Sequence, residues 1–161
     1  MLTRDTDERI RQFAAEEGIE LNRRLGHGVD GVVYSTNRQS AVKGHRYQAL
    51  YQRERDVYRR LEDLDIRRLR GFEIPRLTVF DDHLLVIEMT IVQPPFALDF
   101  AGAYLDQRPD YPDDVLQQWQ AEKQEQFGEN WDEVRRLMAA FARHGIYLAD
   151  VKPGNIEFGE E

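Results

Sequence analysis

Apolar positions follow two different periods in the first part of the chain. Residues 7–17 carry apolar side chains three and four positions apart and end at Gly18, which predicts a short amphipathic helix with a glycine stop. Residues 19–45 change to alternating and β-branched runs around glycines and a polar turn, which predicts consecutive antiparallel strands. Helical spacing returns over residues 47–64, so a second helix is expected to follow these strands.

The region after the second helix carries two more strand-like runs and then a break. Residues 74–92 predict a pair of strands around an Asp-Asp-His turn. The adjacent Pro94 and Pro95 interrupt regular structure, because proline can continue neither a helix nor a central strand. The chain is therefore expected to change character near Pro94.

Two helices are predicted beyond the prolines, over Asp113–Phe127 and Trp131–Arg143. Asn130 and Glu133 have the spacing of a capping box at the start of the second of these helices. A strand-rich half with one long helix thus precedes a helical half. The pattern predicts an α+β fold.

Composition limits the class of protein. At 161 residues with 41% hydrophobic content, the chain can build one domain or two small lobes that share a cleft. The net charge of -8 argues against an extended surface for nucleic acid or anionic membranes. The longest apolar run, residues 84–92, is too short to span a bilayer, and the charged N-terminus does not look like a signal peptide. We therefore expect a cytoplasmic protein with no nucleic-acid or membrane partner.

A glycine-rich stretch is the first candidate for chemistry. Gly26, Gly28 and Gly31 form a G-x-G-x-x-G pattern, but the β-branched run after Gly31 predicts a strand where a dinucleotide-binding turn needs a helix. The glycines are then expected in a hairpin, where backbone N–H groups can cover phosphates. On this pattern alone, glycines that only supply positive φ angles explain the hairpin equally well.

Lys43 and Glu54 form the second candidate. Lys43 follows two small apolar residues on a predicted strand, where an edge lysine with a packed stem is the ordinary explanation. Glu54, however, lies in the apolar stripe of the next helix, four residues after Leu50 and three before Val57. A carboxylate in that position needs a cation. We therefore predict a direct Lys43–Glu54 ion pair that would align Lys43 with bound phosphates.

A polar loop near the C-terminal end is the third candidate. Asp150, Lys152 and Asn155 surround a Pro-Gly pair that excludes a regular helix. An aspartate can orient an attacking hydroxyl, a lysine can neutralise a transferring phosphoryl group, and an asparagine oxygen can bind Mg²⁺. Taken alone, this loop fits a polar turn as well.

Taken together and in order, these segments resemble the eukaryotic-type protein kinase family over roughly residues 19–158. The segments are LGHGVDGVVY at 25–34, AVK at 41–43, the helix glutamate Glu54, LLVIEM at 84–89 and HGIYLADVKPGNI at 144–156. The lysine two residues after Asp150 is more similar to serine/threonine protein kinases than to small-molecule antibiotic kinases. The resemblance implies a kinase-like α+β fold with an antiparallel-sheet N-lobe and a much reduced helical C-lobe.

The resemblance also implies ATP as a cofactor, with Mg²⁺ as the metal of the reaction. Ile87 would be the gatekeeper, and Glu88 and Met89 the hinge. The implied nucleotide-binding residues are Gly26, Gly28, Gly31, Val33, Ala41, Lys43, Glu54, Ile87, Glu88 and Met89. The implied catalytic residues are Asp150, Lys152 and Asn155, with Asn155 as the candidate metal ligand. The implied domains are a helical extension at 1–18, the N-lobe at 19–93 and a truncated C-lobe at 94–161.

Several positions depart from the family pattern. The family's His-Arg before the catalytic Asp is Leu148-Ala149 here, and no Asp follows Asp150 to serve as the D-F-G metal ligand. No residues remain for an activation segment. Glu157 takes the position of the apolar floor beneath the adenine or approaches a metal, and Asp30 would repel phosphates from the glycine loop.

Three functions therefore remain open. The first, favoured by the retained lysine, glutamate and loop residues, is a pseudokinase that binds ATP weakly, with little dependence on Mg²⁺ and without phosphoryl transfer. The second is an active atypical kinase whose metal site is completed by Glu157, Glu160 or a partner's carboxylate. The third is an interaction module without nucleotide. Apolar surface left exposed on the C-lobe would favour a protein partner or self-association.

Overall fold

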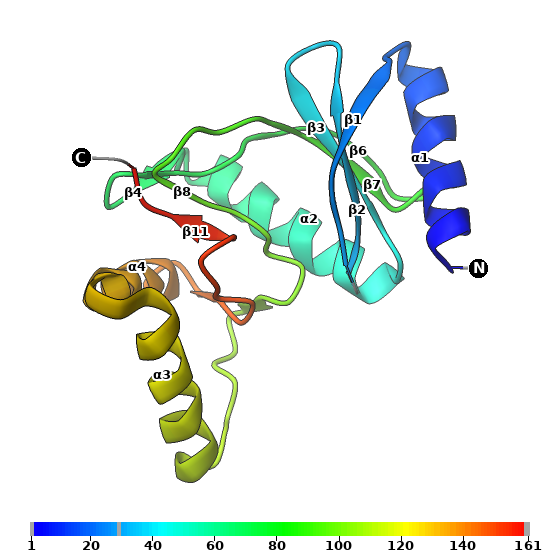
Figure 1. Cartoon of the computed structure of the whole chain (residues 1–161). Helices are drawn as coiled ribbons and strands as arrows, with labels where there is room; N and C mark the ends of the chain where they lie inside the picture. The colour runs from blue at the N-terminus through cyan, green and yellow to red at the C-terminus, as the bar shows by residue number, and fades with distance from the viewer. Residues whose placement is uncertain (1, 29, 160–161) are drawn as a thin grey trace.

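The structure, a computed structural model, describes residues 2–28 and 30–159. Its centre is an antiparallel sheet of five strands in the order β1-β2-β3-β7-β6 (Figure 1). The strands are β1 (Leu21–His27), β2 (Gly31–Thr36), β3 (Ser40–His45), β6 (Leu77–Asp81) and β7 (Val86–Thr90). The predicted α+β fold with an antiparallel sheet in its first half is confirmed.

Two helices cover opposite faces of this sheet (Figure 1). They are α1 (Leu2–Glu17) and α2 (Gln48–Asp63). Ile10 of α1 packs in one apolar cluster with Val42, whereas Tyr58 of α2 packs in another with Ala41. Successive side chains of a strand point to opposite faces, so β3 presents Lys43, like Ala41, to the face that α2 covers.

A second, smaller layer is built from strands of two residues each. A four-stranded sheet has the order β11-β8-β5-β4. Its strands are β4 (Arg68–Leu69), β5 (Phe72–Glu73), β8 (Phe96–Ala97) and β11 (Ile156–Glu157), and a separate pair consists of β9 (Tyr104–Leu105) and β10 (Ile146–Tyr147). These strands were not predicted, because two residues are too few to show a period. They bring the segment after Pro95 alongside the loop at Asp150.

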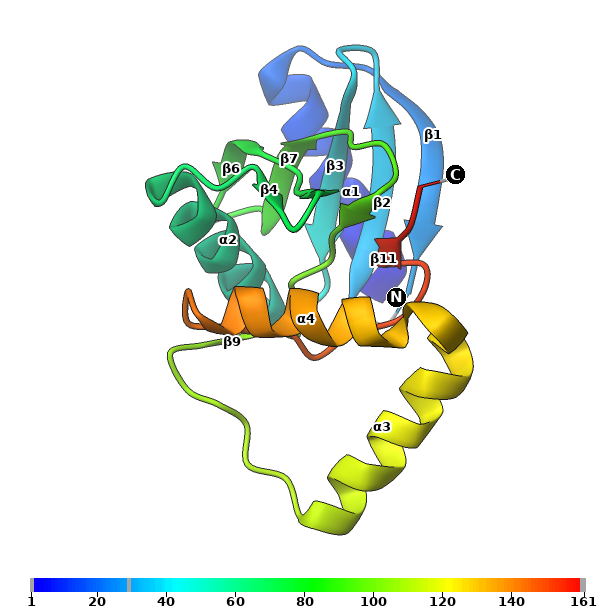
Figure 2. The same ribbon diagram turned by 90° about the vertical axis from the view of Figure 1, so that its left-hand side faces the viewer.

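The remaining elements are helical: α4 packs against the body of the molecule, and α3 projects away from it (Figure 2). They are α3 (Asp113–Phe127), the 3₁₀ turn Gly128–Asn130 and α4 (Trp131–Ala142). Both predicted helices are confirmed, but the predicted capping box is wrong. Asn130 has helical backbone angles and makes no side-chain cap, because the 3₁₀ turn leads directly into α4, while Glu133 accepts a hydrogen bond from Arg70 at 2.8 Å.

Aromatic side chains anchor α3 to α4 at one end only. Trp119 meets Trp131 edge-on with ring centroids 5.9 Å apart. Phe127 is the one residue of α3 that is buried among the described residues. Tyr111, Val115 and Leu116 are exposed beside a cavity of about 560 Å³ between α3 and α4. The expected self-association through this surface stays a prediction. No described helix combines the length and apolar character needed to cross a bilayer.

Candidate functional site

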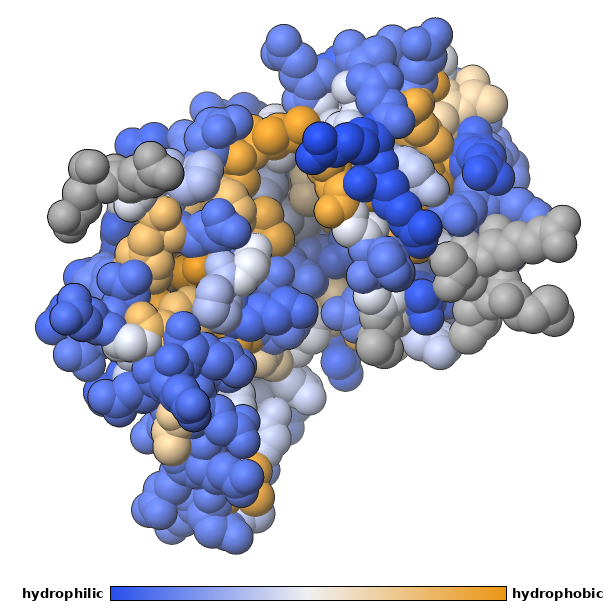
Figure 3. Space-filling view, in the orientation of Figure 1, coloured by the Kyte–Doolittle hydropathy of each residue, from blue (hydrophilic) through white to orange (hydrophobic). Residues whose placement is uncertain are grey.

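A cleft of about 860 Å³ lies between the glycine hairpin and β8, and Figure 3 shows apolar side chains gathered around this hollow. The predicted nucleotide-binding residues that line it are Gly26, Gly28, Gly31, Val33, Ala41, Lys43, Glu54 and Met89. The predicted catalytic residues Asp150, Lys152 and Asn155 line it as well. Three segments that are distant in the sequence therefore meet in one cavity.

The predicted ion pair between Lys43 and Glu54 is confirmed. The Lys43 Nζ lies 2.8 Å from the Glu54 Oε1, and the side chains are only 7% and 1% exposed. Burial opposes the charge of Glu54, but the nearby Lys43 and the hydrogen bond from His45 outweigh it and lower the pKa of the Glu54 carboxyl to about 2. Burial likewise opposes the charge of Lys43, yet Glu54 and Asp99 together raise its pKa above the ordinary lysine value.

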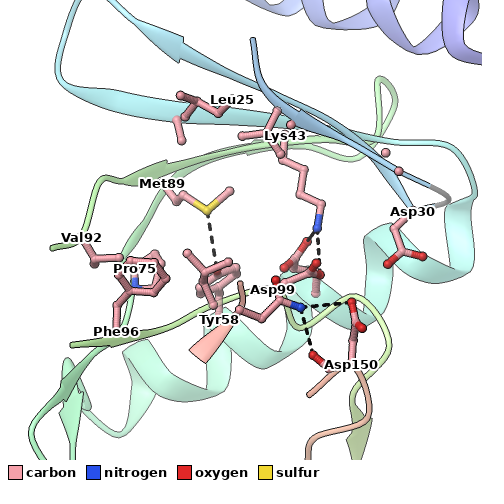
Figure 4. A pocket seen from close by; sticks show the side chains of 18 of the residues that line it. Leu25, Asp30, Lys43, Tyr58, Pro75, Met89, Val92, Phe96, Asp99 and Asp150 are labelled. Atoms are coloured by element: carbon pink, nitrogen blue, oxygen red, sulfur yellow. Dashed lines mark hydrogen bonds and ion pairs between the residues drawn. The ribbon is translucent and has the colours of Figure 1, made fainter. Parts of the chain in front are cut away.

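Asp99 is the site residue that sequence reasoning missed. Its Oδ1 accepts a hydrogen bond from the Lys43 Nζ at 3.1 Å (Figure 4). The next residue, Phe100, donates its backbone N–H to the Glu54 Oε2 at 2.7 Å. Asp99 is held in a left-handed backbone conformation, with φ of 70°. The Lys43–Glu54 pair is thus joined to the segment that follows β8.

Strand pairing explains why Asp99 reaches this position although it precedes the loop at Asp150. β8 pairs with β11, so Ala97 lies opposite Ile156, and the Leu98 N–H donates to the Asn155 carbonyl at 2.9 Å. No Asp follows Asp150 in the sequence, but this pairing brings Asp99, which precedes it, close to Asp150 in space. The signal was present in the sequence as Asp-Phe-Ala-Gly at 99–102.

The loop after β10 is ordered by its own hydrogen bonds. The Asn155 Nδ2 donates to the Asp150 backbone carbonyl at 2.9 Å and to its Oδ2 at 3.2 Å. Lys152 lies 3.9 Å from the same Oδ2, and the Lys152 and Asp150 side chains are 55% and 34% exposed. These two hydrogen bonds engage the Nδ2 of Asn155, so the side-chain Oδ1 is the atom that Asn155 can offer to a cation.

Three carboxylates meet at the mouth of this site. Oxygen atoms of Asp30, Asp99 and Asp150 all lie within 4.8 Å of one another. Burial and repulsion by Asp99 raise the pKa of Asp30, and the charge of Lys43 offsets part of this rise. Carboxylate oxygens are ligands that Mg²⁺ prefers, so this group of side chains offers ligands for the divalent cation that the resemblance to protein kinases implies. Of the predicted substitutes, Glu157 is exposed and does not line the cleft, and Glu160 lies outside the described residues.

The apolar part of the cleft has a roof and a floor. Leu25, Val33 and Ala41 line it from the sheet, while Phe96 and Leu98 line it from the β8 segment (Figure 4 labels Leu25 and Phe96). Glu157, which was expected beneath a purine, instead pairs with Phe96 across β11 and β8 and is exposed. An apolar floor is therefore present, but it comes from β8.

Of the residues predicted at the gatekeeper and hinge positions, Met89 lines the cleft, whereas Ile87 and Glu88 do not. Met89 lines the cleft, where its sulfur accepts a hydrogen bond from the Tyr58 hydroxyl at 3.5 Å (Figure 4), and Ile91 and Val92 follow it there. Glu88 points to the opposite face, where its Oε2 accepts a hydrogen bond from the Arg38 Nε at 2.7 Å. Ile87 shares the face of Met89 but is fully buried in the core and does not line the cleft.

Known structures resemble part of this chain. No protein-family model matches the chain, and no curated protein matches it. Two solved structures, the streptomycin–ATP–APH(2")-IIa ternary complex and the gentamicin–APH(2")-IIa complex, each match with 22% identity and a TM-score of 0.41. Each match covers 53% of this chain and 28% of the other, so the chain spans less than a third of that protein's length.

Replacing Lys43 with Met is expected to lower the free energy of unfolding by about 3 kcal/mol, because the buried Glu54 carboxylate then loses its ammonium partner. Urea unfolding followed by circular dichroism measures the change. Lys152→Met, at the exposed lysine of the loop, is the matched control and should change stability by less than about 0.5 kcal/mol. Equal effects of the two variants would contradict this assignment.

Acid is expected to remove the stability that Glu54 contributes. Its pKa is lowered in the folded state, so this contribution is fully present above the ordinary value of 4.5 and is lost as the pH falls toward about 2. Unfolding free energies measured between pH 6 and pH 2.5 should therefore fall more steeply for the natural protein than for Glu54→Gln. Parallel curves for the two proteins would show that Glu54 is not the group responsible.

Proposed function

We propose that this protein binds ATP together with a divalent cation in the cleft and acts as a phosphotransferase of the kinase-like type. The observation that carries the proposal is the meeting of Lys43, Glu54, Asp99, Asp150 and Asn155 around one cavity. These groups come from separate elements, and their chemistries match the needs of phosphoryl transfer. Positioning and charge neutralisation supply most of the catalysis in such reactions.

The cleft offers a place for each part of the nucleotide. The apolar walls around Leu25, Ala41 and Leu98 suit a purine ring, which would be buried against side chains on both faces. The glycine loop and the ammonium group of Lys43 would hold the phosphates. The Asp99 carboxylate and the side-chain Oδ1 of Asn155 would hold the cation, which when bound neutralises charge on the phosphate oxygens.

Asp150 fits the role of the group that handles the proton. Its carboxylate is partly exposed at the cleft and is oriented by the amide of Asn155. An acceptor hydroxyl next to it would give its proton to Asp150 while its oxygen forms a bond to the γ-phosphorus. The bond between that phosphorus and the β–γ bridging oxygen breaks, so ADP leaves. Lys152, 3.9 Å from Asp150, would neutralise the moving phosphoryl group.

A second candidate is a pseudokinase that binds the nucleotide without transferring phosphate. One observation favours it: Asp30 brings a carboxylate of the glycine loop into the group formed by Asp99 and Asp150, where it would repel the γ-phosphate. The two candidates share nucleotide binding and differ in turnover. They also differ in what removal of the Asp30 charge should do.

Binding of ATP is expected to depend on the cation, because Asp99 supplies a carboxylate ligand. Isothermal titration calorimetry should show affinity that is higher by about tenfold or more in Mg²⁺ than in EDTA. Asp99→Asn should abolish this difference, whereas Glu157→Gln, an exposed carboxylate outside the cleft, should preserve it. Absence of binding under both conditions would overturn the proposed function.

Transfer of labelled phosphate from ATP to protein and small-molecule hydroxyl acceptors separates the two candidates. We expect turnover with Mg²⁺ that is lost in Asp150→Asn, by about a hundredfold or more, because the proton then has no acceptor. Asp30→Asn should raise turnover if its charge repels the γ-phosphate. ATP binding without turnover in the natural protein and in Asp30→Asn would instead favour the pseudokinase.

A further inference from the structure

His45 lies two residues after Lys43 on β3 and faces the same helix. Its side chain is fully buried, and its Nε2 lies 2.7 Å from the Glu54 Oε1. Its Nδ1 lies 3.2 Å from the backbone carbonyl oxygen of Leu85. The edge of the ring meets Tyr51, with ring centroids 5.5 Å apart. Both ring nitrogens therefore face oxygen atoms in a site without exposure to solvent.

These contacts specify how many hydrogens the ring carries. The Leu85 oxygen already accepts the backbone N–H of His45 at 3.0 Å, and a carbonyl oxygen can only accept, so a hydrogen bond from the ring to this oxygen requires a hydrogen on Nδ1. A neutral imidazole has one N–H, and its Nε2 would then turn a lone pair toward the carboxylate of Glu54. Glu54 also receives the Lys43 ammonium at 2.8 Å and the Phe100 N–H at 2.7 Å, which favour its ionised form. Both ring nitrogens of His45 can donate to the oxygen atoms that they face only when each carries a hydrogen.

The backbone around His45 is fixed from the other side of the sheet by α1. The guanidinium group of Arg9 donates to the backbone carbonyls of His45, at 2.7 Å, and of Leu84. A Cβ on Gly44 would lie 2.6 Å from the Ile10 Cγ1, so α1 packs directly onto the backbone between Lys43 and His45. His45 is therefore held rigidly, with little freedom to turn away from Glu54.

We propose that His45 is an imidazolium and serves as the second cation on Glu54, a positioning residue for the nucleotide site. Lys43 already contacts both Glu54 and Asp99, and the proposed function adds the phosphates of ATP to these anions. With a charged His45 beside it, the Glu54 carboxylate keeps a cationic partner and its position while Lys43 also contacts the phosphates. The positioning role of His45 rests on the proposed function, whereas the protonation state of His45 does not depend on it.

The protonation state can be measured without nucleotide. Protein with ¹⁵N-labelled histidine is examined by long-range ¹H–¹⁵N correlation at pH 8, where an ordinary histidine is neutral. We expect one of the four histidines to show two imidazolium-type nitrogens, and this signal should be missing from the spectrum of His45→Gln. A pyridine-like nitrogen on His45 would overturn the proposal.

The positioning role is tested by a double-mutant cycle on ATP affinity. His45→Gln keeps a donor toward Glu54 but removes the charge, and we expect it to weaken ATP binding by about tenfold. In a Glu54→Gln background the same change should have less than about a twofold effect, because no carboxylate remains to be held. A purely structural role predicts the same loss in both backgrounds, and that result would overturn the positioning role.

The two proposals fail in different ways. If the natural protein does not bind ATP, the proposed function falls, while the nitrogen spectrum still supports or overturns the imidazolium. If ATP binds and His45→Gln, folded as judged by circular dichroism, binds it as tightly as the natural protein, the positioning role falls and the nucleotide site stands.

Discussion

The buried carboxylate of Glu54 is the point on which the site depends. It is almost without exposure to solvent, and it receives the ammonium of Lys43, the imidazole of His45 and the backbone N–H of Phe100. A buried charge is stable only while its partners are present, since removing one of them leaves the charge incompletely compensated. Strand β3, helix α2 and the segment after β8 are thereby tied to one another through a single side chain.

Spatial order and chain order differ in the second half of the molecule. The Asp99 segment precedes the loop at Asp150 in the sequence, but the pairing of β8 with β11 sets the two side by side. The carboxylates of Asp99 and Asp150 lie close together for this reason, and Asp30 joins them from the glycine hairpin. The same pairing supplies Phe96 and Leu98 as an apolar floor, and it turns Glu157 outward. The pairing of β8 with β11 thus contributes to both the polar and the apolar parts of the cleft.

The sequence reveals those parts of the site that leave a local signal. Lys43 and Glu54 could be paired in advance, because each is a charge in an otherwise apolar pattern. Asp99 could not be placed, since strands of two residues have no period and contacts across more than fifty residues are invisible without pairing information. Glu88 was expected at the cleft but faces away from it, because the run around it is apolar on both faces and periodicity does not determine which side chains point inward.

The short strand pair β9–β10 determines which part of the chain can change without altering the cleft. Tyr104 pairs with Tyr147, the N–H of Asp106 donates to the Gly145 carbonyl at 2.8 Å, and Arg60 holds the Asp106 carboxylate with two hydrogen bonds of 2.7 Å. The segment between these anchors, which contains α3 and α4, leaves and returns at almost the same point. Changes on the exposed surface of α3 can thus be absorbed without displacing Asp99 or Asp150. Helix α4 is constrained, because its Phe141 packs against Phe100, next to Asp99, with ring centroids 5.6 Å apart. The charged groups of the cleft thus lie on the core side of these anchors, whereas most of α3 lies outside the core.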